Sequence, residues 1–487
     1  MASAFYLFGW FLGAAAVALL ITSGISALID PPGVASIMAA SALLIGFVGI
    51  GLALALGGRE HRLVRAHAYV AALVIWFVAP AVLCVPIRFG HEGTTWIGAY
   101  SDMVSCFTTT GGVFIHDFKT LPDGLKVWRA VVGWLGGLSS LAFIIVVLAP
   151  NKVGGMLLGR RHDPEHRRAT QWDQIRRMLT RVSPIYFGAT VVLFLAFDLA
   201  GVPSTDALVL AMGTLSTSGI QMDPGDLTNY TGAGVPAIAI IGMIAGGFGF
   251  LWISAVVRIR LISFRGHFES FAGLAICLIV GLALAIGLYL GGAGAAGLSP
   301  VEAVTEGLLT SVSLVTTSGY GVRPEAFFFM PLPFVLFIVA VGGVTISTAG
   351  GFKIFRFLAM MAQSRRELDR LLYPHRIMAM RVGDQTYDIQ LMKAVWSSFA
   401  IYCAAVASLA VVLSYDLPHY TGALAAAVTT MSSAGPLLDI GMAGEPGWTG
   451  YDGLHHFTKL AMVIGMVLGR LEILAVLSLI NIRLVRA

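Results

Sequence analysis

Long apolar runs separated by short basic segments dominate the pattern of this 487-residue chain. Residues 5–28, 34–56 and 70–85 are the first three apolar runs, and similar runs continue toward the C-terminus. A run of about 20 apolar residues can cross the hydrocarbon core of a bilayer as a helix. Because no basic region precedes the first run, we expect it to be a retained helix rather than a signal peptide. The pattern therefore predicts an integral membrane protein that begins with a transmembrane hairpin.

After this hairpin, one order of elements recurs four times: an apolar helix, a shorter segment too polar to span, and a second apolar helix. The shorter segments are WIGAYSDMVSCFTTTGGVF, TDALVLAMGTLSTSGIQM, VEAVTEGLLTSVSLVTTSGYGV and YTGALAAAVTTMSSAGPLL. Each fits a half-helix that stops inside the membrane and returns as an extended loop. Such backbone is tolerated at membrane depth only where protein buries it or where it lines a watery cavity. The predicted fold is all-α, with four pseudo-repeated helix–pore-loop–helix units around one pore plus the N-terminal two-helix hairpin.

The basic residues give the expected orientation and boundaries. Only 12% of the residues are charged, and most of the Lys and Arg residues lie in a few short segments. The positive-inside rule places these segments in the cytoplasm, and the intervening units then run parallel to one another. The predicted order is an N-terminal transmembrane hairpin (1–56), a cytoplasmic basic loop (57–67), pore repeat 1 (68–150), a cytoplasmic amphipathic linker (151–183), pore repeat 2 (184–257), pore repeat 3 with a gating loop (258–352), a cytoplasmic linker (353–393) and pore repeat 4 (394–487).

Each of the four half-helices ends in a Ser/Thr-rich run followed by glycine. Backbone carbonyls from four such loops can replace the hydration shell of an ion, and the negative ends of the half-helices favour a cation. The runs contain no carboxylate, which suits a weakly hydrated monovalent ion better than calcium or magnesium. The predicted ion-binding filter consists of Thr109, Thr110, Gly111, Thr217, Ser218, Gly219, Thr317, Ser318, Gly319, Ser433, Ala434 and Gly435.

Two further features belong to the predicted pore. The last helix of the third repeat, FVLFIVAVGGVTISTAGGFKIFRF, is interrupted by glycines, which favours either an unwound gating segment lining a cavity or tight helix packing. The predicted gating residues are Gly342, Gly343, Ser347, Thr348, Gly350 and Gly351. Arg470 lies in the final apolar run, where a charge is costly and usually faces protein or water. We expect it to point into the pore below the filter, and the alternative is an ion pair with Glu472.

With these motifs in view, the chain resembles the membrane subunit of the Trk/Ktr/HKT superfamily of potassium transporters, most closely the TrkH type. The resemblance covers essentially the whole chain and rests on TTTGG at 108–112, TTSGYG at 316–321, ISTAGGFKIFR at 346–356 and GRLEIL at 469–474. It implies a channel-like potassium-uptake subunit of the bacterial inner membrane, a homodimer with one pore per subunit, and a cytoplasmic ring of TrkA-type nucleotide-binding subunits. It also implies potassium at the filter, nucleotide only on the partner, and no cofactor in this chain.

One departure from the family pattern bears on selectivity. Glycine at all four filter positions resembles the potassium-selective members, whereas the fourth signature, SSAGPLL, lacks the Asn and the second Gly that the family more often has. Ala434 supplies a carbonyl but no side-chain partner, so a less selective potassium/sodium transporter stays open. The signatures also leave open whether transport is channel-like or a symport coupled to protons or sodium.

Three other functions compete with this interpretation. A potassium-binding subunit of an ATP-driven pump shares the four-repeat plan, although it would be longer and would need an ATPase partner. A secondary transporter with inverted repeats conflicts with the parallel units. A membrane enzyme would need a nucleophile or metal motif, and HExxH, GxSxG and GxxxxGK[ST] do not occur in the sequence. The basic cluster at 160–181 is explained by orientation and an amphipathic helix without RNA.

Overall fold

The computed structural model is predominantly helical. It describes residues 2–58, 65–148, 175, 180–223, 227, 230, 234–249, 268–290, 299–321, 325–373, 381–382, 385–386, 389–417, 419–442 and 448–472. The amphipathic linker predicted at 151–183 therefore lies largely outside the described residues, as do the start of predicted pore repeat 3 (258–267) and the last residues of the final apolar run.

The N-terminal hairpin consists of two long helices packed side by side, α1 (Ala2–Ile29) and α2 (Val34–Leu56). Their backbones approach closely where both carry glycine: a Cβ on Gly9 would lie 2.8 Å from the carbonyl oxygen of Gly49. Small residues allow such close packing between membrane helices, where burial from water drives no association. Because α1 also contacts α3 and α6, the hairpin covers the outside of the first repeat.

The first repeat begins with α3 (Arg65–Leu83) and α4 (Val85–Gly90), which together form one apolar span. A half-helix, α5 (Trp96–Phe107), then descends into the protein, with the Thr95 hydroxyl capping its N-terminus. After the predicted filter segment, a short 3-10 helix η1 (Phe118–Thr120) leads into α6 (Asp123–Phe143) and η2 (Ile144–Leu148). The half-helix packs between α3 and α6.

The same order of elements follows three more times. The second repeat contains α9 (Ser183–Leu199), α10 (Ser204–Ser216) and α11 (Gly234–Gly247). The third contains α13 (Phe268–Leu290), α14 (Pro300–Val315), α15 (Glu325–Phe328), α16 (Leu332–Val341) and α17 (Ile354–Leu372). The fourth contains α18 (Ile389–Leu413), α19 (Tyr420–Met431), α20 (Pro436–Gly441), η7 (Tyr451–Gly453) and α21 (His456–Leu471).

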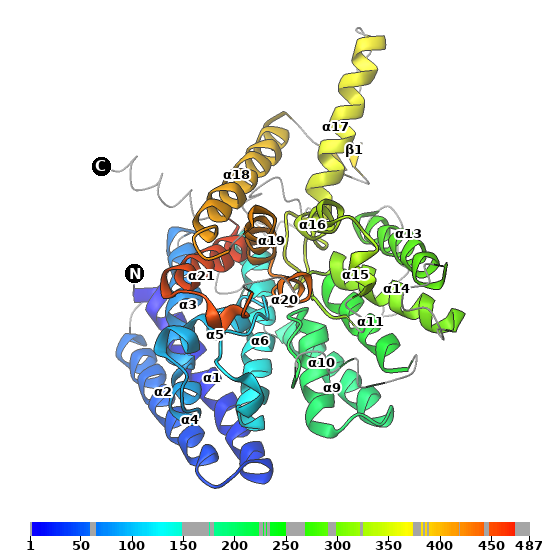
Figure 1. Ribbon diagram of the computed structural model, residues 1–487. Helices are drawn as coiled ribbons and strands as arrows, with labels where there is room; N and C mark the ends of the chain where they lie inside the picture. The colour runs from blue at the N-terminus through cyan, green and yellow to red at the C-terminus, as the bar shows by residue number, and fades with distance from the viewer. Residues whose placement is uncertain are drawn as a thin grey trace.

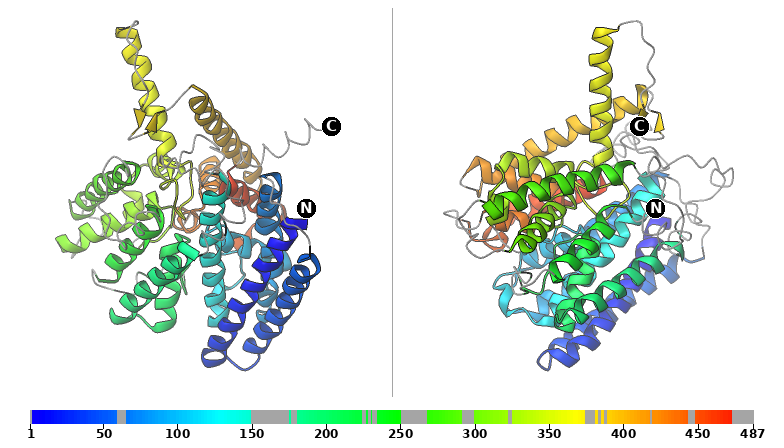
Figure 2. Two further views of the ribbon diagram at one scale, coloured as in Figure 1. Left: turned by 180° about the vertical axis from the view of Figure 1, so that it is seen from behind. Right: turned by 90° about the vertical axis from the view of Figure 1, so that its right-hand side faces the viewer.

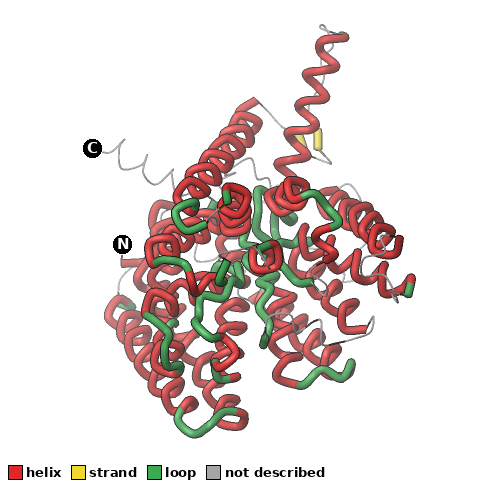
Figure 3. The backbone as a smooth tube through the Cα atoms, viewed as in Figure 1, coloured by secondary structure: helices red, strands yellow, loops and turns green. Residues whose placement is uncertain are grey.

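The four groups of helices succeed one another around a common centre (Figure 1). Loops rather than helices gather at that centre, with α20 among them (Figure 3). Helix α17 projects away from the rest of the helices in all views (Figure 2). The architecture thus brings chain segments from all four repeats together where the filter is predicted.

Six described helices are long and apolar enough to cross a membrane, consistent with a multi-pass membrane protein. The all-α class predicted from the sequence is confirmed, with one small local exception among the described residues. A two-stranded antiparallel sheet, β1 (Arg381–Val382) and β2 (Gln385–Thr386), lies between α17 and α18, where β-branched residues favour strands.

Candidate ion-conducting site

All four half-helices end in the same backbone turn. One or two residues after each helix the backbone takes the left-handed conformation, with φ between 53° and 57° at Thr109, Thr217, Thr317 and Ser433. The next residue's N–H then donates to the carbonyl oxygen five residues earlier, at 2.8 to 3.0 Å in the pairs Thr110–Ser105, Ser218–Gly213, Ser318–Ser313 and Ala434–Thr429. This is the Schellman helix end, in which glycine normally holds the left-handed position.

Threonine in this position is unusual, because a β-branched residue at positive φ is strained. Such strain persists only where the surroundings enforce it, and it is typical of functional sites. Thr109, Thr217, Thr317 and Ser433 are each about 1% exposed. Each of the four repeats therefore has a buried hydroxyl residue at the left-handed position after its half-helix, although this conformation is strained.

The glycines that follow allow neighbouring loops to touch. Gly111 and Gly219 have φ of 78° and 68°, and a Cβ on either would overlap a carbonyl oxygen of the next loop, Ser218 or Ser318 respectively. A Cβ on Gly319 would lie 2.9 Å from Pro436 of the fourth loop. The first three loops thus contact their successors in chain order through glycine.

The fourth loop closes this ring differently. Gly435 has φ −55°, in the right-handed helical region, and its N–H donates to the carbonyl oxygen of Thr110 at 2.7 Å. Its own carbonyl accepts a 2.7 Å bond from the Tyr451 hydroxyl. Two backbone carbonyls at this junction are therefore already occupied by hydrogen bonds.

Side-chain hydroxyls support three of the loops but not the fourth. In each of the first three repeats, two hydroxyls two residues apart bond to one another at 2.8 to 3.0 Å, in the pairs Thr108–Thr110, Ser216–Ser218 and Thr316–Ser318. The fourth loop has Ala434 at the second position, and Ser432 bonds instead to the Tyr402 hydroxyl at 2.8 Å. The departure noted in the sequence thus coincides with a different hydrogen-bond pattern.

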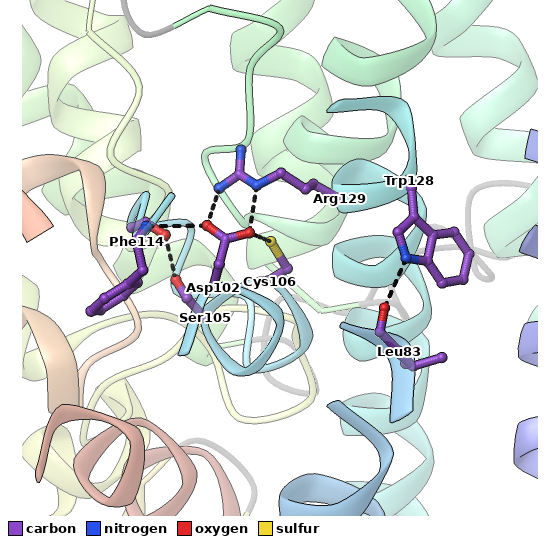
Figure 4. A network of polar contacts seen from close by, with 8 residues as sticks. Leu83, Asp102, Ser105, Cys106, Phe114, Trp128 and Arg129 are labelled. Atoms are coloured by element: carbon purple, nitrogen blue, oxygen red, sulfur yellow. Dashed lines mark hydrogen bonds and ion pairs between the residues drawn. The ribbon is translucent and has the colours of Figure 1, made fainter. Parts of the chain in front are cut away.

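A buried ion pair supports the first loop from behind (Figure 4). Asp102 on α5 receives two hydrogen bonds from Arg129 on α6, at 2.7 and 2.9 Å, and both side chains are at most 1% exposed. Asp102 also accepts the Phe114 N–H at 3.2 Å, and the Ser105 hydroxyl donates to the Gly112 carbonyl at 2.9 Å. Sequence analysis missed this pair, although an acid and an arginine in apolar surroundings were a usable signal.

The glycine-interrupted segment of the third repeat is not helical. Helix α16 ends at Val341 and α17 begins at Ile354, and residues 342–353 between them form a folded loop, hereafter called the gating loop after the role predicted from the sequence. Within it, the N–H of Gly343 donates to the Gly350 carbonyl at 3.3 Å, and the Ser347 hydroxyl donates to the Val344 carbonyl at 2.6 Å. The loop therefore folds back on itself.

The gating loop touches three of the four loops that contain the predicted filter residues (hereafter the filter loops). Its Gly350 N–H donates to the Thr317 hydroxyl oxygen at 2.8 Å, and its Thr348 hydroxyl lies 3.1 Å from that of Thr217. A Cβ on Gly350 would overlap the Ser432 carbonyl of the fourth loop. The loop thus covers the helix-side ends of the second, third and fourth filter loops.

Charged side chains from α13 and from the gating loop itself hold the loop in its folded conformation. Glu269 at the start of α13 accepts the Thr345 N–H at 2.8 Å and the Phe355 N–H at 3.2 Å. The ammonium group of Lys353 donates to the Ala349 carbonyl at 2.6 Å. Neither Glu269 nor Lys353 was identified from the sequence. The partners of Glu269 become evident only once α13 and the loop are packed together, whereas Lys353 bonds within its own loop.

Arg470 contacts the gating loop from the fourth repeat. It lies in the last turn of α21 and is 8% exposed, and its guanidinium donates to the Ser140 hydroxyl on α6 at 2.7 Å and to the Thr348 carbonyl at 2.6 Å. The alternative ion pair between Arg470 and Glu472 is wrong, because Glu472 pairs with Arg356 on α17. Residues two apart on a helix do not face each other, and φ of 59° at Glu472 turns its side chain away.

These observations define a class: a predominantly helical, multi-pass membrane protein with six described helices long and apolar enough to span a bilayer. A family model described as TrkH, cation transport protein, matches residues 67–485, and the chain belongs to this family. The resemblance found in the sequence is thereby confirmed, and so is the prediction of a transport protein rather than an enzyme.

Known proteins of this family are similar along most of their length. The chain is 29% identical to the Trk system potassium uptake protein TrkI of Halomonas elongata, over 85% of this chain and 82% of that protein. It is 24% identical to the Trk system potassium uptake protein TrkH of Escherichia coli strain K12, over 84% of each. The crystal structure of the potassium transporter TrkH from Vibrio parahaemolyticus shares the fold, with a TM-score of 0.85, 22% identity and 98% of both chains covered.

Proposed function

We propose that the chain is the channel-like, potassium-conducting subunit of an uptake system in the bacterial inner membrane. The observation that carries this proposal is the fourfold recurrence of a half-helix ending in a buried, left-handed hydroxyl residue, with four loops meeting at one centre. The names of the similar proteins, which are potassium uptake proteins, support the identity of the ion. They also favour an uptake subunit over the potassium-binding subunit of a pump.

Conduction would pass through the oxygens of the predicted filter. The four half-helices direct their negative ends toward the loops, and carbonyls and hydroxyls supply neutral oxygen ligands. None of the predicted filter residues is Asp or Glu, so this pathway offers oxygens without fixed carboxylate charge. That chemistry suits a weakly hydrated monovalent cation.

The gating loop and Arg470 form the barrier of the proposed pore. The loop lies against the filter, and the guanidinium of Arg470 adds a positive charge that would shorten the residence of a cation there. The loop continues directly into α17, which exposes Leu368, Leu371 and Leu372 beyond the helix bundle. A cytoplasmic nucleotide-binding partner that binds α17 would therefore displace the gating loop when it changes conformation. This partner and the homodimer are proposals that follow from the family resemblance.

The proposal is tested by rescue of a potassium-uptake-deficient bacterium on low-potassium medium. We expect the wild type to restore growth and Gly219→Ala to fail at equal membrane expression, because the new Cβ would overlap the Ser318 carbonyl. Gly441→Ala is the matched control, since no atom lies within 4 Å of its Cβ position. A wild type that reaches the membrane without restoring growth would overturn the proposed function.

A second candidate, a potassium/sodium transporter of low selectivity, is favoured by the fourth loop. Ala434 lacks the hydroxyl pairing of the other three loops, and Gly435 has a different backbone conformation. The two candidates are distinguished by tracer uptake of rubidium and sodium into the same liposomes. Uptake of both ions at comparable rates would support the second candidate.

A further inference from the structure

The four left-handed hydroxyl residues differ in what their hydroxyls bind. Thr109, Thr217, Thr317 and Ser433 (hereafter the hydroxyl set) occupy equivalent positions, yet the gating loop forms hydrogen bonds with the side chains of only two of them among the described residues. The Thr317 oxygen accepts the Gly350 N–H at 2.8 Å, and the Thr217 oxygen lies 3.1 Å from the Thr348 hydroxyl.

The other two hydroxyls have no hydrogen-bond partner among the described residues. Thr109 and Ser433 are each 1% exposed, and their hydroxyl oxygens are buried without a bond. Leaving a buried polar group unpaired is costly, so such groups call for an explanation such as an ion or a water. Because the equivalent residues of the other repeats meet the gating loop, these two oxygens lie at the same level of the proposed pathway and are available to a ligand.

The chemistry of the set specifies the ligand. Four hydroxyl oxygens without a carboxylate suit a monovalent, weakly hydrated cation. A backbone N–H that points at one of these oxygens presents partial positive charge where the cation would sit. In the conformation seen here, the set therefore offers two free oxygens, one oxygen blocked by Gly350 and one engaged by Thr348.

We propose that the gating loop and the transported cation compete for the hydroxyl set, so that loop opening completes a cation site and cation binding favours loop opening. This inference rests on the proposed function and extends it to regulation. A ligand that binds one of two conformations more tightly shifts the equilibrium toward that conformation, and the coupling is reciprocal. Potassium would therefore promote the opening of its own gate.

The test uses two measurements on the purified full-length chain. The first is the potassium concentration that half-maximally raises the thermal unfolding temperature, with choline as the replacement cation. The second is rubidium leak through the closed protein in liposomes. Together they separate cation binding from loop opening.

Thr348→Val removes the hydroxyl that lies 3.1 Å from the Thr217 hydroxyl and donates to the Leu215 carbonyl at 3.2 Å, while keeping the carbonyl that Arg470 binds. We expect the half-maximal potassium concentration to fall roughly two- to tenfold, the range that one net hydrogen bond contributes to a binding constant, and the rubidium leak to rise. Thr348→Ala repeats the test with a smaller side chain if the valine variant expresses poorly.

Variants of the hydroxyl set should change potassium binding in the direction opposite to that of Thr348→Val. Thr109→Val removes a ligand oxygen without touching the gating loop, so potassium binding should weaken while the leak does not rise. Thr317→Val removes both a ligand and the acceptor of Gly350, so the leak should rise while potassium binding weakens. A purely structural role for these residues would shift all three variants in the same direction.

Two outcomes would overturn different parts of the argument. An increased leak in Thr348→Val with an unchanged potassium midpoint would refute the competition while leaving the pore intact. A wild type that neither is stabilised by potassium nor passes rubidium would instead refute the proposed function itself.

Discussion

The buried pair of Asp102 and Arg129 provides the sharpest energetic prediction. Both side chains are at most 1% exposed, and two hydrogen bonds of 2.7 and 2.9 Å join them. Removing one partner of a buried pair leaves an uncompensated charge and costs about 3–5 kcal/mol of stability. We therefore expect Arg129→Met to lower the free energy of unfolding by about that amount, because the Asp102 carboxylate keeps only the Phe114 N–H and the weak Cys106 thiol contact.

A double-mutant cycle separates the pair from its surroundings. The double variant Asp102→Asn/Arg129→Met removes both charges, so its loss of stability should be well below the sum of the two single losses. Equilibrium unfolding in mixed micelles measures all three variants. The matched control is Glu367→Gln on α17, whose pair with Arg370 is half-exposed, and it should cost only about 0.2–1 kcal/mol. Additive losses in the cycle would refute the buried-pair argument.

The pair should also affect ion selection, because Asp102 holds the segment that follows Gly111. When Arg129→Met loosens this segment, the sodium-to-rubidium uptake ratio in liposomes should rise relative to the wild type. The Glu367→Gln control should leave the ratio unchanged. A destabilised variant with the wild-type ratio would restrict the pair to a structural role.

Three further variants test the filter and its barriers by tracer uptake. Gly111→Ser should raise sodium uptake relative to rubidium, because a side chain at φ 78° would overlap the Ser218 carbonyl, and an unchanged ratio would count against Gly111 in the filter. Arg470→Ala should increase rubidium flux by removing a charge and the bond to the Thr348 carbonyl, whereas Arg470→Lys should retain the charge and give a smaller increase. Pro436→Ala should also increase flux, since the proline ring lies 2.8 Å from the Cβ position of Gly219 and 2.9 Å from that of Gly319; equal flux would place the ring off the pathway.

The order of helices and half-helices was predictable because its causes are local. Apolar runs of sufficient length form spans, and a short polar run ending in Ser, Thr and Gly cannot continue as a helix. The same holds for residues 342–353, where four glycines interrupt an apolar helix and the structure has a loop. These features depend on neighbours within a few residues along the chain, which a single sequence displays directly.

The contacts that position the site were not predictable, because they join residues far apart in the chain. Arg470 meets Ser140 and the gating loop only after the first, third and fourth repeats have packed together. Glu472 is the acid nearest to Arg470 in the sequence, yet in the folded chain Glu472 forms an ion pair with Arg356. Charge pairing in a membrane protein is decided by which helix faces meet, and a single sequence does not specify those faces.

The fourth loop shows how one residue type can meet two different physical demands. Gly111, Gly219 and Gly319 take positive φ, which glycine permits without a Cβ penalty. Gly435 has φ −55° and precedes Pro436, and a residue before proline is disfavoured in the helical region partly because its Cβ clashes with the proline ring. Glycine escapes that clash, and its missing Cβ also lets the Gly435 N–H reach the Thr110 carbonyl.

The four filter signatures are therefore alike in sequence but not in geometry, and an ion at this level would meet three similar loops and one different loop. Substituting Gly435 should accordingly disturb the junction with the first loop, near Thr110, rather than the fourth loop's own turn. Gly435→Ala should then raise sodium uptake relative to rubidium in the same direction as Gly111→Ser, because both changes act on the first loop. Opposite effects of the two variants on that ratio would show that the loops act independently.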